Sequence, residues 1–294
     1  MIGSLAPWFG SKRTLAPRIV EALGPHRAYW EPFCGSMAVL LAKEPTSFET
    51  VNDLHADLIN LATVIQDPVK GPRFYRRLRR TLASEGMFDR CAEQFNDAWT
   101  GEGNEERAFV YFTCSWLGRN GIAGTNIGQK RGAGHSFCVR YTLNGGQPNR
   151  RWFSAIASIP QWRERLRSVL ILQRDAFEVI GNIQDHKDVA IYVDPPYLAS
   201  TRSGFTAPGG SSHYRHDFAS DDHMRLSTAL NRFEAARVVV SYYDSPELDR
   251  LYPGWAKIDC TMRKSITNTG KDQGSKSAPE VLLINNRNAG GLFA

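Results

Sequence analysis

Apolar residues follow two different periods along the chain, which predicts a protein that contains both helices and strands. Helical spacing is expected at 15–23, 37–42, 56–65, 221–234 and 246–252. Between these segments stand short β-rich runs, at 28–31, 50–53, 166–173, 189–193, 237–242, 256–259 and 280–285. Regular alternation of strands and helices predicts an α/β fold with a doubly wound, mostly parallel sheet.

The apolar run at 189–193 reads as a buried strand, and Asp194-Pro195-Pro196-Tyr197 follows it directly. Two prolines cannot extend a central strand, because they lack N–H donors and fix φ. An amine placed here could donate one hydrogen to the Asp194 carboxylate and another to the Pro195 carbonyl. Its lone pair would then be free to attack, while Tyr197 could stack on an attached planar ring. Methylation of an exocyclic amino group is one of the few chemistries that need this arrangement; a simple Asp-Pro turn is the alternative.

Two further strand ends are candidate ligand sites. Glu31 to Ser36 forms a turn with one glycine, Gly35, between a strand and a helix, which is the ligand-facing corner of a doubly wound sheet. Asp53 ends the next strand, where an acid commonly bonds ribose hydroxyls; a helix N-cap is the alternative. The G-x-G-x-x-G fingerprint of nicotinamide dinucleotide sites is absent.

Weaker signals lie at two other loops. Gly10-Ser11-Lys12 precedes a helix and could approach a ligand through its backbone and ammonium group, although a surface lysine is the simpler alternative. Asp175 and Phe177 follow the strand at 166–173. They could hold an adenine ring, or Asp175 could cap the next helix.

The middle of the chain is basic and has a different pattern. Residues 68–168 hold 17 Lys and Arg against 8 Asp and Glu, whereas the rest holds 19 against 22. This balance predicts an insert that binds a polyanion. Five arginines between 73 and 80 suit phosphate contacts on a helix, or form a solvated face. The apolar segment 109–116 predicts a packed core element. The polar, Gly-rich stretch 119–152 is expected to be a long loop, functional or disordered, whose basic, amide and aromatic residues suit phosphate and base-edge contacts.

Composition restricts the cellular setting. No apolar run approaches the ~20 residues of a membrane span, and the N-terminus lacks a signal-peptide layout. The five cysteines are scattered without CxxC spacing, which indicates reduced thiols rather than disulfides or a zinc site. We therefore expect a cytoplasmic protein without a membrane or metal partner.

Taken together, the motifs resemble the D12 class of DNA N6-adenine methyltransferases, the family of Dam and related phage enzymes. The segments that carry the resemblance are Trp8-Phe9-Gly10-Ser11-Lys12, Glu31-Pro32-Phe33-Cys34-Gly35-Ser36, Asn52 to Ile59, Asp194-Pro195-Pro196-Tyr197, Arg263-Lys264-Ser265-Ile266 and Glu280-Val281-Leu282-Leu283. Met37 stands where many members have a glycine. After Arg119-Asn120-Gly121 the chain departs from the segment of Dam, so a GATC target is not expected.

The resemblance implies that a methyl group passes from S-adenosyl-L-methionine (AdoMet) to an adenine flipped out of double-stranded DNA. Catalysis is expected from Asp194, Pro195, Pro196 and Tyr197. The expected AdoMet-binding residues are Trp8, Lys12, Glu31, Phe33, Gly35, Asp53, Asp175, Phe177 and Asp194. The expected DNA-binding residues are Arg76, Arg77, Arg80, Arg119, Asn120, Lys130 and Arg131.

The same resemblance divides the chain into a catalytic domain, 1–65 and 168–294, and an inserted, mainly helical and loop target-recognition domain, 66–167. We expect a monomer. The alternatives are a methyltransferase for cytosine N4, RNA or protein glutamine, and a catalytically silent DNA-binding protein.

Overall fold

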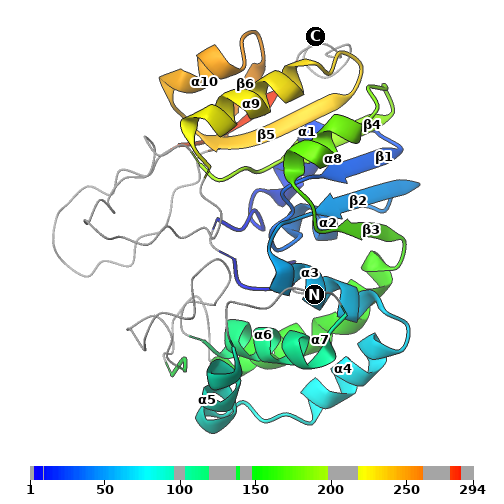
Figure 1. The fold of residues 1–294 in the computed structure, drawn as a ribbon, viewed down its shortest axis with the longest axis vertical. Coiled ribbons are helices and arrows are strands. Elements are labelled where there is room, and N and C mark those ends of the chain that lie inside the picture. Colours follow the sequence, from blue (N-terminus) through cyan, green and yellow to red (C-terminus); the bar gives the residue numbers. More distant parts are fainter. Residues whose placement is uncertain are drawn as a thin grey trace, which may run out of the picture.

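A seven-stranded sheet forms the middle of the molecule (Figure 1). The computed structural model describes residues 3–8, 10–95, 103–118, 137–139, 148–197, 218–260 and 279–285. The strands are β1 Ala28–Glu31, β2 Phe48–Asn52, β3 Val169–Leu172, β4 Val189–Val193, β5 Arg237–Tyr243, β6 Ala256–Asp259 and β7 Glu280–Ile284. Their order in the sheet is β3-β2-β1-β4-β5-β7-β6.

Strands β3, β2, β1, β4 and β5 pair in parallel, and β7 runs antiparallel to both β5 and β6. In the register, Trp30 lies opposite Thr50 on one side and Ile191 on the other. All five residues of β4 are buried, as expected for a parallel strand that is covered on both faces. The predicted α/β class with a doubly wound, mostly parallel sheet is therefore confirmed.

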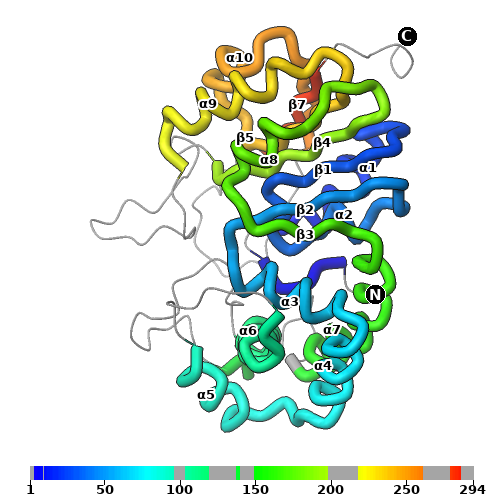
Figure 2. The backbone as a smooth tube through the Cα atoms, turned by 45° about the vertical axis from the view of Figure 1, so that its right-hand side comes forward, coloured from blue at the N-terminus to red at the C-terminus, as the bar shows by residue number. Residues whose placement is uncertain are grey.

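Helices cover the two faces of this sheet, as Figures 1 and 2 show. The helices are α1 Ala16–Leu23, α2 Ala38–Ala42, α3 Ala56–Gln66, α4 Lys70–Arg79, α5 Glu85–Gln94, α6 Glu105–Leu117, α7 Pro148–Leu166, α8 Ala176–Asn182, α9 Ser220–Asn231 and α10 Pro246–Leu251. Residues of α1 and α2, such as Ile19 and Leu40, share one core with Tyr29 of β1. On the other face, residues of α8 and α9 pack with Ile191 and Val240 in a second core.

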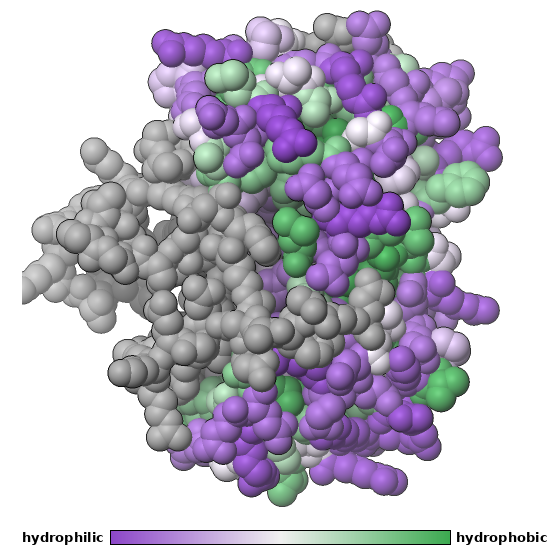
Figure 3. Space-filling model, in the orientation of Figure 1, coloured by the Kyte–Doolittle hydropathy of each residue, from purple (hydrophilic) through white to green (hydrophobic). Residues whose placement is uncertain are grey.

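The helices of the second face leave part of the sheet open. Phe48 of β2 and Leu170 of β3 point to this face, and their side chains are 68% and 55% exposed. Figure 3 shows the face, on which apolar side chains are visible between largely polar surroundings. The core that α8 and α9 form on this face covers β4 and β5, and among the described residues it does not extend to the exposed Leu170 of the edge strand β3.

Helices α4 to α7 lie beyond the β3 edge, against α3 (Figures 1 and 2). They do not form a separate core: Phe74 of α4, Phe112 of α6 and Trp152 of α7 belong to the same apolar cluster as Leu58 of α3 and Tyr29 of β1. The helical content of the insert agrees with the sequence prediction, whereas the domain boundaries themselves stay a prediction.

Two buried ion pairs join these helices to the rest of the chain. Arg107 of α6 forms a bidentate pair with Asp57 of α3. Glu49 of β2 accepts from both Lys43 and Arg165, the latter on α7. The insert is thereby joined to α3 through α6 and to β2 through α7.

One predicted loop was wrong at its end. Helix α7 begins at Pro148, so residues 148–152 are helical, and Trp152 is fully buried. The reason is an apolar stripe at helical spacing, Trp152, Ile156, Ile159 and Trp162, that packs into the core. The Gly-rich residues before it had concealed this periodicity. The predicted strand at 166–173 also began too early, because Leu166 ends α7 and β3 starts at Val169.

Two further observations bear on the predicted setting. All five cysteines are free and buried. In the part of the chain that the structure describes, no helix combines the length and the apolar character that a bilayer crossing requires.

Candidate active site

Three acidic residues lie at the carboxyl ends of three adjacent strands. Glu31 is the last residue of β1, Asp53 follows β2, and Asp194 follows β4. Because β2, β1 and β4 are neighbours and parallel, these ends meet at one edge of the sheet. The chain reverses its winding between β1 and β4, and such a switch point is where open α/β sheets bind ligands.

Lys12 connects the N-terminal loop to this edge. Its ammonium nitrogen lies 2.9 Å from Oδ1 of Asp194 and 3.2 Å from Oε1 of Glu280, and it donates to the Gly10 carbonyl at 3.1 Å. It also donates to the hydroxyl of Tyr197. Burial by itself lowers the pKa of Lys12. The charge of Asp194 acts in the opposite direction, with smaller contributions from Tyr192 and Glu280, and together these three groups raise the pKa above its ordinary value. The lysine is therefore a buried cation shared by two carboxylates.

The Asp194 carboxylate is fixed through one of its oxygens. Oδ1 receives Lys12 and a hydrogen bond of 2.9 Å from the hydroxyl of Ser241, on the neighbouring β5. The hydroxyls of Ser241 and Tyr192 are in turn 3.0 Å apart. Among the described residues, no donor contacts Oδ2. Burial raises the pKa of Asp194, and Lys12 and Ser241 limit that rise.

Tyr197 is buried, with 6% of its surface exposed. Its hydroxyl donates to Glu280 at 3.0 Å, and its ring centre lies 4.3 Å from that of Tyr243. Lys12 lies over the same ring, 4.9 Å from its centre. Pro195 and Pro196 carry the chain from β4 to this tyrosine, as the sequence predicted for a strand that must end.

Glu31 is a second buried carboxyl group at the edge. Its Oε2 accepts a hydrogen bond of 2.9 Å from the Tyr29 hydroxyl. Burial raises the pKa of Glu31 to about 8, which the Tyr29 hydrogen bond opposes in part. A small cavity brings it together with other predicted site residues; its lining includes Trp8, Lys12, Glu31, Gly35, Tyr192 and Asp194.

The turn around Gly35 has a left-handed backbone, with φ +44°. A Cβ at Gly35 would lie 3.0 Å from Nε1 of Trp8, so glycine is needed for both conformation and space. Asp53 holds this turn: its Oδ2 accepts from the Gly35 N–H at 2.8 Å, and its Oδ1 accepts from the His55 N–H at 2.9 Å. The N-cap of α3 is His55, so the helix-cap alternative for Asp53 is wrong.

Met37 also has a left-handed backbone, with φ 58°, and no other non-glycine residue in the described ranges has a positive φ. This is the position where the resemblance led us to expect glycine. The methionine side chain is fully buried, so its packing offsets the strain of an unfavourable backbone conformation.

Asp175 is the N-cap of α8, because its Oδ1 accepts from the N–H groups of Phe177 and Glu178. The ring of Phe177 stacks on Phe218, with centres 5.9 Å apart and an interplanar angle of 7°. Phe33 meets the same Phe218 edge to face, also at 5.9 Å. Phe33 and Phe177, predicted from separate loops, therefore lie on one aromatic cluster.

The predicted DNA-binding residues that the structure describes, Arg76, Arg77 and Arg80, are not part of this site. Figures 1 and 2 place α4 at the side of the insert away from the carboxyl ends of the strands. Arg76 and Arg80 are exposed there, whereas Arg77 forms a bidentate pair with Glu106 and lies over the Phe109 ring. The predictions for Arg119, Asn120, Lys130 and Arg131 fall outside the described residues.

Sequence reasoning missed three residues of the site: Ser241, Glu280 as a partner of Lys12, and Phe218. Ser241 is a lone hydroxyl within the apolar run of β5, and Glu280 is the acid that begins β7. Each is a weak indication in the sequence of a polar residue that belongs to the site. No cluster of three or more metal-ligating side chains occurs in the described ranges.

Comparison with known proteins gives two matches. The family described as D12 class N6 adenine-specific DNA methyltransferase matches residues 8–265. The chain is also 26% identical over 286 residues to the retron Ec67 DNA adenine methylase of Escherichia coli, which covers 96% of this chain and 91% of that protein.

Proposed function

Because the chain belongs to the D12 class of N6 adenine-specific DNA methyltransferases, we propose that the cluster around Asp194 is where it methylates adenine in DNA. The protein is thus an enzyme, a DNA adenine methyltransferase. This family membership favours adenine in DNA over cytosine N4, RNA or protein glutamine. The observation that carries the site assignment is the Asp194 carboxylate, with Oδ1 held by Lys12 and Ser241 and Oδ2 open.

The family implies AdoMet as methyl donor, and residues of this edge fit it. The Gly35 turn packs directly on Trp8, because a Cβ there would lie 3.0 Å from Nε1 of Trp8, and both residues line the small cavity that contains Glu31 and Asp194. Glu31 is a buried acid, and a cationic group beside it would stabilise its ionised form. When bound, AdoMet supplies an electrophilic methyl group on a positively charged sulfur.

The proposed cofactor contacts divide between three strand ends. Glu31 and the Gly35 turn, with Trp8 behind it, would hold the methionine part. Asp53 would contact the ribose, while it keeps its hydrogen bond to the Gly35 N–H. Phe33 and Phe177 would contact the adenine ring, together with Phe218. Asp175 caps α8 through Oδ1, so a cofactor contact from Asp175 would use Oδ2.

The chain's own residues then orient the target amine. Oδ2 of Asp194 would accept one N6 hydrogen, and the Pro195 carbonyl would accept the other. The lone pair of N6 would then be free to attack the methyl group of AdoMet. Lys12 keeps Asp194 ionised despite burial, because a carboxylate beside an ammonium is favoured in its charged form. Catalysis is mainly positioning, without a covalent intermediate on the protein.

A base must leave the duplex to reach Asp194. Tyr197 would stack on that base, and its burial here means that the ring has to be uncovered when the base enters. Lys12 and Glu280 hold the Tyr197 hydroxyl in place. Movement of a group packed against the ring, such as Tyr243, would therefore uncover the ring without moving Tyr197 itself.

Transfer of radiolabelled methyl from AdoMet to DNA tests the function, and single-molecule sequencing of DNA from expressing cells reports the base and its site. Asp194→Ala should lower turnover on the order of 10³-fold or more, since a positioning group is removed. AdoMet binding and the melting temperature should change little by comparison. Near wild-type turnover in this variant contradicts the assignment of Asp194, and label on cytosine or only on RNA contradicts the substrate.

A further inference from the structure

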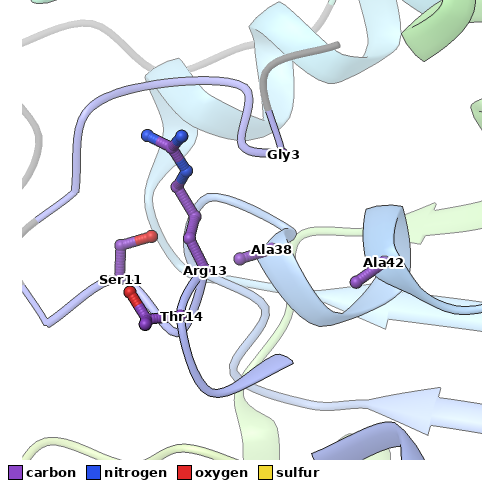
Figure 4. Close-up of a pocket in the computed structure, with 6 residues that line it drawn as sticks. All are labelled: Gly3, Ser11, Arg13, Thr14, Ala38 and Ala42. Carbon is purple, nitrogen blue, oxygen red and sulfur yellow. The ribbon is translucent and has the colours of Figure 1, made fainter. Parts of the chain in front are cut away.

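A second pocket lies next to the candidate active site, between the turn at 11–15 and α2. It is lined by Gly3, Ser11, Arg13, Thr14, Ala38 and Ala42 (Figure 4). Ser11 and Ala38 also line the cavity that contains Lys12 and Asp194, so the two spaces share a wall. The pocket is therefore adjacent to the place where the target base is proposed to bind.

The two consecutive basic residues of this turn have different environments. Lys12 is buried and neutralised by Asp194 and Glu280. Arg13 is exposed, and Figure 4 shows its side chain extending from the turn, with the guanidinium group beyond the hydroxyls of Ser11 and Thr14. Within the described ranges no carboxylate pairs with Arg13, and none lines the pocket. Its fixed positive charge is thus available to a ligand.

The lining has the chemistry of an anion site. Arginine presents several N–H donors in a planar fork that matches the oxygens of phosphate, and serine and threonine hydroxyls are common phosphate donors. The remaining lining residues, Gly3, Ala38 and Ala42, are small and leave room for the ligand. A carboxylate could use the same donors, so both sources of a bound anion are separated in the experiment below.

We propose that this pocket binds a backbone phosphate of the DNA strand whose adenine enters the active site. A flipped base stays attached to its strand, so phosphates on either side of it must pass along the rim of the site. The pocket shares Ser11 and Ala38 with the wall of the site, and it offers a cation that pairs with no carboxylate among the described residues. The inference rests on the proposed function, because it takes DNA as the ligand.

The test compares Arg13→Ala with Arg27→Ala, which removes the same charge from an exposed arginine just before β1, at the opposite end of the sheet. Binding of a mixed-sequence DNA duplex is measured by fluorescence anisotropy over a series of salt concentrations. Arg13→Ala should flatten the plot of log affinity against log salt by roughly 0.9, the value for one lost phosphate contact. Arg27→Ala should leave the slope unchanged. A melting curve for each variant checks folding, and Arg13→Lys, which keeps the charge, should retain most of the slope.

Calorimetric titration with AdoMet separates the two kinds of anion. Unchanged AdoMet affinity with a flatter salt slope supports the phosphate site. A fall in AdoMet affinity with an unchanged slope shows that the pocket takes the carboxylate of the methyl donor, and overturns the proposal, as does no change in either. If wild-type protein transfers no methyl group to DNA, the proposed function fails. If wild-type transfer is intact and the Arg13→Ala slope is unaltered, only the pocket assignment fails.

Discussion

The ammonium nitrogen of Lys12 lies 2.9 Å from Oδ1 of Asp194, and this contact ties the N-terminal loop to the end of β4. Glu280, at the start of β7, is the second acid on the same lysine. Three elements that are distant in sequence therefore depend on one buried cation. Removal of the cation leaves two carboxylates in a poorly solvated place, which is more harmful than loss of the attraction alone.

Lys12→Met should consequently destabilise the protein, by less than the about 3–5 kcal/mol that breaking a fully buried pair costs, because Asp194 and Glu280 are 22% and 23% exposed. Urea unfolding followed by circular dichroism measures this free energy. The double variant Lys12→Met with Glu280→Gln should recover part of the loss, because one uncompensated charge is removed. A Lys12→Met protein as stable as wild type would contradict the role of this lysine as the neutralising cation.

Ser241→Ala tests whether the second hydrogen bond to Asp194 positions the carboxylate. A hydrogen bond to a charged group contributes about 1.5–3 kcal/mol, so we expect kcat to fall by roughly one to two orders of magnitude. The affinity for AdoMet should be unchanged, since the Ser241 hydroxyl forms its hydrogen bonds with Asp194 and Tyr192.

Tyr192→Phe is the matched control, because it removes the hydroxyl 3.0 Å from Ser241 without touching Asp194. Its effect on kcat should be smaller than that of Ser241→Ala. Equal effects of the two changes on kcat, or a Ser241→Ala enzyme altered only in KM, would argue against positioning of Asp194 through Ser241.

The pH dependence of stability should show the unusual state of Glu31. Its pKa is about 8 in the folded protein, against an ordinary value of 4.5, so the folded state holds one more proton between these pH values. Stability from this group is fully present below about pH 4.5 and is lost as pH rises toward 8, with a slope of at most about 1.4 kcal/mol per pH unit. Wild type should therefore lose stability relative to Glu31→Gln across this range.

Thermal unfolding of wild type and Glu31→Gln from pH 5 to pH 8 measures the difference in stability between them. The effects of other titrating groups largely cancel in this difference, because both proteins contain those groups. Saturating AdoMet should reduce the slope, because a cationic ligand beside Glu31 favours the carboxylate. Parallel curves for wild type and Glu31→Gln without ligand would mean that Glu31 is ionised throughout this range.

The insert should be held to α3 by the buried ion pair between Arg107 and Asp57. Arg107→Leu leaves Asp57, which is fully buried, without its bidentate partner, so we expect a loss of about 3–5 kcal/mol in the free energy of unfolding. Arg73→Leu is the control, since Arg73 pairs with Glu105 at the surface and such pairs contribute about 0–1 kcal/mol. Denaturant titration of both variants measures the loss in the free energy of unfolding for each. If both variants lose similarly little, the Arg107–Asp57 pair does not hold the insert in place.

Charge reversal at Arg76 and Arg80 tests the predicted DNA contact of α4. If these exposed arginines bind phosphates, affinity should fall for every DNA sequence, and the salt slope should flatten by roughly 0.9 per contact. The methylated site should not change, because phosphates carry no sequence information. Arg77 is left intact, since it is paired with Glu106. An unchanged salt slope would identify α4 as a solvated face.

Much of the architecture and chemistry was determined by the sequence alone. Period-2 and period-3.6 patterns are local, so β1, β4 and α3 could be placed within a residue or so of their observed bounds. Asp194 to Tyr197 and Glu31 to Gly35 carry their chemistry in adjacent residues, and the carboxyl ends of parallel strands necessarily meet at one edge. These features required no knowledge of long-range contacts.

Only the tertiary structure decided the partners. Ser241 and Glu280 reach Lys12 and Asp194 because β5 and β7 follow β4 in the sheet order, and no local pattern specifies that order. Likewise Phe33 and Phe177 come together only through Phe218, and Asp53 supports the Gly35 turn instead of capping α3. The packing of Trp152 into the core of the insert, and the left-handed backbone of the buried Met37, depend in the same way on neighbours from other elements. Periodicity shows which side of a segment is buried, whereas the fold alone determines which groups meet there.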